Sequence, residues 1–178
     1  DDVRPLLMPS CGLEERTSVA PAKKYFVVRR SPIAGLGAFA ICDIKRGTRI
    51  VEYTGERISA AEAARRARRR KRVVFFEVDS RTLIDAAVGG GPAHRINHSC
   101  EGNCDTFATA RGRIIIAALR DIQAGEELTY DYRLELEEGA TLATAQQRYP
   151  CRCGAPRCRG TMVDLGARAS TTGSVPMG

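Results

Sequence analysis

Short apolar segments bounded by Gly, Pro, Asn or Asp recur through the middle of the chain. Tyr25–Arg29 and Arg49–Tyr53 combine β-branched and aromatic residues, which favours strands. Residues 31–37 contain a proline and two glycines and predict the turn after the first strand. Four more segments have the composition of strands, namely 73–79, 81–85, 106–110 and 114–119.

One stretch has a convincing helical pattern. Ser59 and Glu62 are spaced as a capping box, and the Ala/Arg-rich run behind them predicts a helix that continues to about Arg72. Many short strands with one main helix predict a β-rich α+β domain. Residues 1–22 and 163–178 are poor in periodic apolar positions, so we expect a flexible N-terminal arm and a flexible tail.

Composition narrows the class of protein. Of the 178 residues, 43% are hydrophobic, which is enough for one ordinary core. The apolar runs are too short to cross a bilayer and the N-terminus lacks the layout of a signal peptide, so we expect no membrane contact. The net charge of +7 comes mostly from Arg65–Arg72. This run permits weak nucleic-acid contact or nuclear import, and a solvated helix face explains it equally well.

Seven cysteines in a chain without an export signal favour metal ligation over a disulfide framework. Cys151, Cys153 and Cys158 place three thiolates within eight residues. A closed structural Zn²⁺ site needs a fourth ligand. By residue type, the candidates for that ligand are Cys100, Cys104 and His98.

Two polar motifs could form a binding site. Residues 97–100 read Asn-His-Ser-Cys and gather short polar side chains with an imidazole where loops are expected to cross. Tyr130 and Tyr132 lie two positions apart, so their rings project to one face while the chain stays extended. Gly35 and Gly37 leave two positions without a Cβ, which lets the backbone approach a ligand closely. Taken singly, each pattern also fits an ordinary turn or core.

Three motifs follow one another in a distinctive order: Asn-His-Ser-Cys at 97–100, Gly-Glu-Glu-Leu-Thr-Tyr-Asp-Tyr at 125–132, and the cysteine triplet. In this order they resemble the SET-domain protein-lysine methyltransferases with a post-SET tail. The resemblance runs from about Tyr25 to about Thr161. It implies several short-stranded sheets with a knot-like crossing, one main inserted helix and a zinc-binding C-terminal segment. The implied divisions are an arm (1–22), a SET domain (23–138), a post-SET zinc segment (139–162) and a tail (163–178).

The same resemblance implies roles for individual residues. Tyr132 takes the position of the catalytic tyrosine, and Tyr130 the position that limits how many methyl groups are added, which predicts mono- or dimethylation. The residues implied to contact S-adenosylmethionine are Gly35, Leu36, Gly37, Asn97, His98 and Tyr132. The zinc ligands implied are Cys100, Cys151, Cys153 and Cys158. In one departure from the pattern, Val74 stands where many relatives carry a tyrosine.

The resemblance implies a lysine substrate in a basic tail, with a histone as the first expectation. Acidic residues that could receive such a tail are Glu126, Glu127, Asp131, Glu135, Glu137 and Glu138. Two alternatives stay open: methylation of a lysine in a ribosomal or DNA-binding protein, and an inactive SET-like module that binds chromatin or nucleic acid through Arg65–Arg72. The expected location is the nucleus and chromatin for a eukaryotic protein. For a stand-alone bacterial member it is the cytoplasm, or a host nucleus for a secreted effector.

Overall fold

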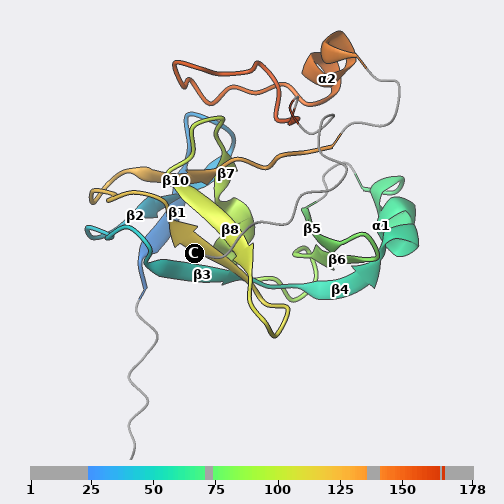
Figure 1. Ribbon diagram of the computed structural model, residues 1–178, viewed down its shortest axis with the longest axis horizontal. Helices are drawn as coiled ribbons and strands as arrows, with labels where there is room; N and C mark the ends of the chain where they lie inside the picture. Colours follow the sequence, from blue (N-terminus) through green and yellow to red (C-terminus); the bar gives the residue numbers. More distant parts are fainter. Residues whose placement is uncertain (1–23, 71–73, 136–140, 165, 167–178) are drawn as a thin grey trace, which may run out of the picture.

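The computed structural model describes residues 24–70, 74–135, 141–164 and 166. The predicted arm at 1–22 and nearly all of the predicted tail lie outside these residues. Figure 1 shows a main sheet, a smaller sheet with helix α1 beside it, and a C-terminal segment with helix α2 on the side of β7 and β10. Within the described residues, helices α1 and α2 have eight and seven residues, and neither is long and apolar enough to cross a membrane.

The main sheet has seven strands and joins distant parts of the sequence. Its order is β1 (Phe26–Arg30), β2 (Leu36–Ala40), β10 (Glu127–Tyr130), β8 (Cys104–Ala108), β9 (Ile114–Ala118) and β3 (Arg49–Tyr53), with β7 (Asn97–His98) paired to β10 off this path. Strand β10 runs antiparallel to β2 and parallel to both β7 and β8. The motif at 97–100 therefore lies directly against the segment that carries Tyr130.

Residues that are buried along nearly the whole length of the central strands build the core. Ala38 of β2, Ile116 of β9 and Leu128 of β10 have no exposed surface, and each comes from a different strand. Gly102 lies against β10 so closely that an added Cβ would stand 2.7 Å from the Cα of Tyr130. The chain that leads from β7 to β8 is thus packed tightly around β10, where the resemblance places a crossing.

The smaller sheet and its helix form an insert between β3 and β7. Its strands are β4 (Glu56–Ser59), β6 (Thr82–Asp85) and β5 (Phe75–Asp79), in that order, and all neighbours are antiparallel. Helix α1 (Ala60–Ala67) begins as predicted, because the Ser59 hydroxyl accepts a hydrogen bond from the Glu62 N–H at 3.2 Å. The prediction that it continues to about Arg72 is wrong, because α1 ends at Ala67 and Arg70 turns toward Asp85.

The C-terminal segment contains a helix that the sequence pattern did not reveal. This helix, α2 (Leu142–Arg148), is capped by Thr141. Elsewhere in the chain, a short 3-10 helix at Pro92–Arg95 precedes β7. The C-terminal segment is attached to the rest of the chain by backbone pairing of Leu134 with Val163. Val163 is buried, so the chain is still held at the start of the predicted tail.

The predicted β-rich α+β class is confirmed, and four local predictions are corrected. Strand β2 was not expected, since it begins within the predicted glycine-containing turn at 31–37. Strand β4 was not expected because two of its four residues are charged. Strand β8 begins two residues earlier than predicted. Strand β10 ends at Tyr130, so Tyr132 lies just beyond the extended strand that was expected to carry both tyrosines. Each difference follows from long-range strand pairing, which a local composition signal cannot report.

Candidate active site and zinc site

The loop before β2 leaves open space beside its backbone. Gly35 has a φ of +50°, a conformation that side chains rarely adopt, and no atom lies within 4 Å of the position of an added Cβ. At Gly37 the opposite holds, because an added Cβ would overlap the carboxylate of Glu127. The two glycines therefore serve different needs, a sharp turn with open space at Gly35 and close packing at Gly37.

Asn97 joins this loop to the motif at 97–100. Its amide nitrogen lies within hydrogen-bond distance of the Ser31 hydroxyl (3.1 Å), the carbonyl oxygens of Ala34 (3.3 Å) and Leu36 (3.2 Å), and the Glu127 carboxylate (2.8 Å). The Ser31 hydroxyl also donates to Glu127 at 2.8 Å. These contacts all use the nitrogen of the buried Asn97 amide, so its oxygen is directed away from the cluster.

Three tyrosines, Tyr53, Tyr130 and Tyr132, lie close to one another. The rings of Tyr130 and Tyr132 are 4.8 Å apart, although only Tyr130 lies within β10. The Tyr132 hydroxyl donates to the carbonyl oxygen of Ile96 at 2.8 Å. The third ring, Tyr53 of β3, is buried, packs 5.1 Å from the ring of Phe76 and donates its hydroxyl to the carbonyl oxygen of Val74 at 3.1 Å.

Burial keeps the phenols of Tyr53 and Tyr130 neutral. It raises the pKa of both Tyr53 and Tyr130 above the usual value, and the neighbouring Tyr132 adds to the effect. A neutral phenol can donate one hydrogen bond and accept others without introducing a charge. The cluster thus offers polar oxygens in a buried setting at any physiological pH.

His98 lies between the tyrosines and the cysteines. Burial lowers its pKa to about 4, so the ring is neutral near pH 7. Its Nδ1 accepts a hydrogen bond from the backbone N–H of Tyr132 at 3.1 Å, and its Nε2 lies 3.4 Å from the sulfur of Cys100. The ring also packs edge-on against Tyr132 at 5.3 Å. Its contacts within the chain therefore fix the backbone of Tyr132.

Four cysteine sulfurs from two distant segments meet in one cluster. The ligand atoms of Cys100, Cys151, Cys153 and Cys158 all lie within 4.8 Å of one another. Cys104, which the residue types left open as a fourth ligand, is instead buried in β8 beside Asn103. His98 is next to the cluster and contacts it through Cys100.

The spacing of these sulfurs fits a tetrahedral Zn²⁺ site. With Zn–S bonds of about 2.3 Å, two ligands of a tetrahedron stand about 3.8 Å apart. The sulfur of Cys100 lies 3.7 Å from that of Cys151 and 4.0 Å from that of Cys158. Burial raises the pKa of Cys100 and Cys151, whereas at Cys153 burial is outweighed by the Ala155 N–H and the neighbouring thiols, which lower the pKa to about 6, so Cys153 is the thiol that most readily forms a thiolate before metal binds.

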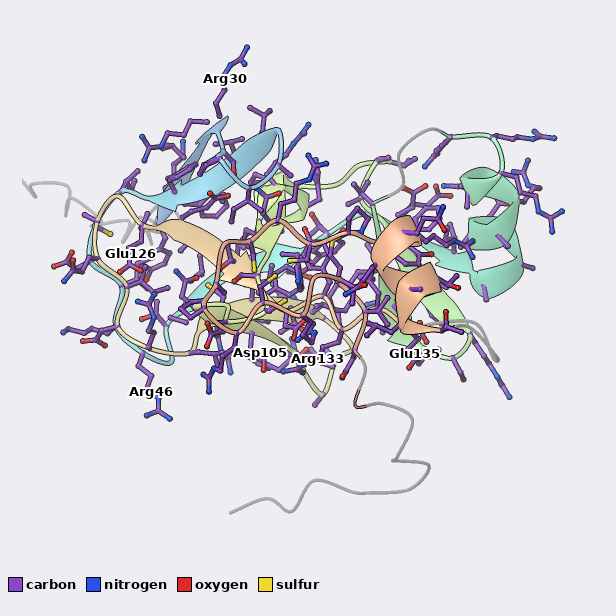
Figure 2. All side chains as sticks on the ribbon, turned by 90° about the horizontal axis from the view of Figure 1, so that it is seen from above. Arg30, Arg46, Asp105, Glu126, Arg133 and Glu135 are labelled. Carbon is purple, nitrogen blue, oxygen red and sulfur yellow. The ribbon has the colours of Figure 1, made fainter. Side chains whose placement is uncertain are left out.

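The charged groups near the site are largely paired. Asp131 binds Arg159, Glu126 binds Arg120, and the carboxylate of Glu127 is engaged by Ser31 and Asn97. Two members of the expected acidic flank, Asp131 and Glu126, are therefore neutralised by arginines, whereas Glu127 is held by neutral groups and keeps its charge. Glu137 and Glu138 lie outside the described residues. In Figure 2 the labelled Glu126 and Glu135 lie far apart along the molecule, so they do not form one patch.

The structure adds residues that the sequence reasoning did not place at the site. Glu127 and Ser31 hold Asn97, Tyr53 joins the tyrosine cluster, and Arg159 binds Asp131. The Glu-Tyr-Thr-Gly-Glu sequence at 52–56 resembles a family segment near the donor and substrate, and this signal could have pointed to Tyr53. Glu127 belongs to the family-like segment at 125–132, but its role there was predicted only as part of an acidic flank, and Arg159 carried no comparable signal.

Comparison with protein families identifies the class. The SET domain family matches residues 35–133, a span that includes the glycine loop, the tyrosine cluster and Cys100. The chain therefore belongs to the SET-domain family.

Individual relatives are histone methyltransferases and Polycomb complexes. The chain is 42% identical over 146 residues to the histone-lysine N-methyltransferase of Saccharomyces cerevisiae specific for H3 lysine-4, and 38% identical over 144 residues to human histone-lysine N-methyltransferase 2D. The matches cover 78% and 77% of this chain but only 13% and 2% of those proteins. The chain thus spans a small part of the relatives' length.

Solved structures agree with this placement. The Polycomb repressive complex 2 of Chaetomium thermophilum matches with a TM-score of 0.61 and 35% identity, over 66% of this chain and 16% of that one. The same complex in an autoinhibited conformation bound to S-adenosylmethionine matches with a TM-score of 0.58 and 36% identity, over 62% of this chain and 15% of that one.

Proposed function

We propose that this chain is an S-adenosylmethionine-dependent protein-lysine N-methyltransferase that acts on a basic protein tail, with a histone as its substrate. The observation that carries the proposal is the buried tyrosine cluster, in which the Tyr132 hydroxyl is held by the carbonyl oxygen of Ile96 beside Tyr130 and Tyr53. Relatives over three quarters of the chain are named histone-lysine N-methyltransferases, which supports the same reaction.

The donor would lie along the loop at 35–37. S-adenosylmethionine supplies a methyl group on a positively charged sulfonium. The open space beside Gly35, in the loop whose backbone Asn97 contacts, suits a ligand with an amino acid headgroup. Glu127 would add a negative charge near the amino group of that ligand and would hold the Asn97 amide in one orientation.

The substrate amine must be neutral when it attacks. A free lysine has a pKa of about 10.4, and lowering it by about 3 units costs roughly 4 kcal/mol in water. A buried channel lined by neutral phenols disfavours the ammonium form, so no separate strong base is needed. The hydroxyl of Tyr132 would orient the amine, and alignment of the reacting atoms would supply most of the rate.

We further propose that Tyr130 restricts the enzyme to mono- or dimethylation. Its ring is buried against Tyr132, where its hydroxyl takes up space that additional methyl groups need. The side chain of Val74 packs against the core, and its carbonyl oxygen accepts a hydrogen bond from the Tyr53 hydroxyl. Tyr53 therefore brings a phenol next to position 74, just before β5, where many relatives carry a tyrosine of their own.

We also propose that the four-cysteine cluster binds a structural Zn²⁺. The sulfur spacing and the four thiol ligands support a closed site with no open position for water. Since Cys100 belongs to the motif at 97–100 and the other three ligands to the C-terminal segment, zinc would fasten that segment to the active site. Metal loss would then lower activity as well as local order.

The proposed surroundings are nuclear, with chromatin as the site of action. Contact with nucleic acid stays a prediction, and the basic run offers less for it than its sequence suggested. Within the described part of the run, Arg65, Arg66 and Arg70 bind carboxylates, which leaves the exposed Arg68 and Arg69 as the main candidates. A shallow dependence of DNA affinity on salt, with a slope of about −2, would fit two phosphate contacts.

The experiment that tests the function is mass spectrometry of core histones after incubation with this protein and S-adenosylmethionine. We expect single or double methyl increments on a lysine, and Tyr132→Phe should abolish them. Tyr149→Phe is the matched control, because Tyr149 lies outside the cluster, at the end of α2, and should leave the increments unchanged. Increments on ribosomal or DNA-binding proteins alone would move the substrate away from histones. No increment on any basic protein, with donor binding intact, would contradict the proposal.

A further inference from the structure

An ion pair joins the active-site tyrosines to the cysteine cluster. Asp131 stands between Tyr130 and Tyr132 in the sequence, and Arg159 directly follows Cys158. Both terminal nitrogens of the guanidinium bind the Asp131 carboxylate, one to each oxygen, at 2.7 and 2.8 Å. The side chains are only 25% and 19% exposed, so solvent screens this pair less than the exposed pairs elsewhere on the molecule.

On its inner side, Asp131 fixes the turn that follows β10. Its carboxylate accepts from the backbone N–H of Arg133 at 3.2 Å and lies 3.5 Å from Nδ1 of His98. The same Nδ1 accepts from the backbone N–H of Tyr132. Arg133 has a φ of +48°, an uncommon conformation for a residue with a side chain, and in Figure 2 it is labelled next to Asp105, to which it pairs at 3.4 Å. His98 thus holds the backbone of Tyr132, and Asp131 holds the backbone of Arg133 directly after it.

On its outer side, Arg159 is placed by the cysteine cluster. Its backbone N–H lies 3.4 Å from the sulfur of Cys100, and its own chain neighbour is Cys158. Within the described residues, its Nε is buried and has no hydrogen-bond partner. The position of Arg159 is set by its two bonds to Asp131 and by the contact of its backbone with Cys100, and these contacts outweigh the cost of the unpaired Nε.

A second ion pair, Arg157 with Glu101, also joins the C-terminal segment to the chain after the motif at 97–100, and it is weaker than the Asp131–Arg159 pair. Arg157 binds Glu101 at 2.7 Å, but its side chain is 87% exposed. Pairs this exposed contribute little to stability or to coupling between sites. Arg157 therefore offers a control within the same segment for an effect that belongs to Arg159.

We infer that the Asp131–Arg159 pair transmits zinc binding at the cysteine cluster to the donor and lysine site, which makes Arg159 a positioning residue for methyl transfer. The inference rests on the proposed function, since it requires that the chain bind both zinc and the donor. Zinc would fix Cys158 and hence Arg159. Arg159 would then hold Asp131 and the turn that carries Tyr132, a predicted donor contact. Binding at one site should therefore strengthen binding at the other, and the coupling must be reciprocal.

The test measures this coupling directly in the full chain. Zinc affinity is determined by competition with a chelator, with and without S-adenosylhomocysteine, the product form of the donor. For the wild type we expect S-adenosylhomocysteine to tighten zinc binding about tenfold, within the usual range for coupled sites. For Arg159→Gln we expect less than a twofold effect, although the protein still binds zinc through its four cysteines. Arg157→Gln should couple the two ligands as the wild type does.

Two more variants separate coupling from simple loss of structure. Arg159→Lys keeps the charge but replaces two bonds with one, so it should retain part of the coupling. Asp131→Asn should lower the coupling as Arg159→Gln does. Wild-type coupling in Arg159→Gln would overturn the inference. A wild-type protein that binds both ligands with no coupling would also overturn it. A wild-type protein that binds neither zinc nor S-adenosylhomocysteine would instead overturn the proposed function.

Discussion

The contact that should matter most for holding the insert in place is the carboxylate of Asp85. This side chain is fully buried and accepts from Arg66 and Arg70, each at 2.7 Å, and from the backbone N–H of Ala87 at 3.0 Å. It thereby ties the C-terminal end of α1 to the end of β6. The next residue, Ala86, donates to the carbonyl oxygen of Val74, which also receives the Tyr53 hydroxyl. The clamp around Asp85 therefore supports the wall of the proposed lysine channel.

The cost of breaking this clamp can be estimated from its bonds. Hydrogen bonds to a charged group contribute about 1.5–3 kcal/mol each, and breaking a buried ion pair costs about 3–5 kcal/mol. Asp85→Asn keeps the shape but places an amide N–H against donor guanidinium groups. Arg66 keeps its bonds to Glu56 and Glu62, and Arg70 is 31% exposed, so the loss falls below the range for a fully buried pair. We expect a destabilisation of about 2–3 kcal/mol.

The assay is urea unfolding followed by circular dichroism, with thermal unfolding as a second measurement. At about 2–4 °C per kcal/mol for a chain of this size, the melting temperature should fall by about 5–10 °C. Glu62→Gln is the matched control, because Glu62 binds Arg65 and Arg66 at the surface and such pairs contribute less than about 1 kcal/mol.

The pH dependence gives an independent check. Burial alone would raise the pKa of Asp85, but the hydrogen bonds from Arg66 and Arg70 outweigh it and lower the pKa. A lowered folded-state pKa stabilises the protein above the unfolded value of about 3.9, and this stabilisation disappears as the pH falls through the folded-state pKa. The difference in free energy of unfolding between wild type and Asp85→Asn should therefore be constant near neutral pH and shrink below about pH 4. A difference smaller than that of Glu62→Gln, or one that grows in acid, would refute the reasoning.

Three further predictions concern the proposed site. Tyr130→Phe should raise the number of methyl groups added per lysine, because it removes a hydroxyl beside Tyr132, and an unchanged product distribution in mass spectrometry would contradict the steric argument. Glu127→Ala should weaken binding of S-adenosylhomocysteine about tenfold in calorimetry, because Asn97 loses an ionic acceptor. Glu127→Gln should restore part of the affinity. Wild-type affinity in the alanine variant would rule out this role of Glu127. Removal of zinc by a chelator should make four thiols reactive toward a thiol reagent while the buried Cys104 stays slow, whereas equal reactivity before and after chelation would argue against a metal site.

Several parts of the fold follow from local sequence alone. The β-branched and aromatic composition of β1, β3, β6 and β9 predicted strands close to their observed positions, because β-branched residues favour extended backbone wherever the strand finally pairs. The capping box at Ser59 predicted the start of α1 for a similarly local reason, a bond between residues three apart. The end of α1 was missed, because Arg66 and Arg70 turn toward Asp85, fifteen or more positions away along the chain.

The sequence by itself determined which residues could do chemistry, and the tertiary structure decided how they meet. The motif at 97–100, the paired tyrosines and the cysteine triplet are recognisable because their residue types and spacings are local properties of the chain. Their assembly depends on β10, which pairs with β2 on one side and with β7 and β8 on the other. That pairing places Glu127 against Asn97 and Asp131 within reach of Arg159, and it brings Cys100 to the C-terminal cysteines. Contacts between residues about thirty to sixty positions apart are set by packing of the whole domain, so no local pattern could have specified them.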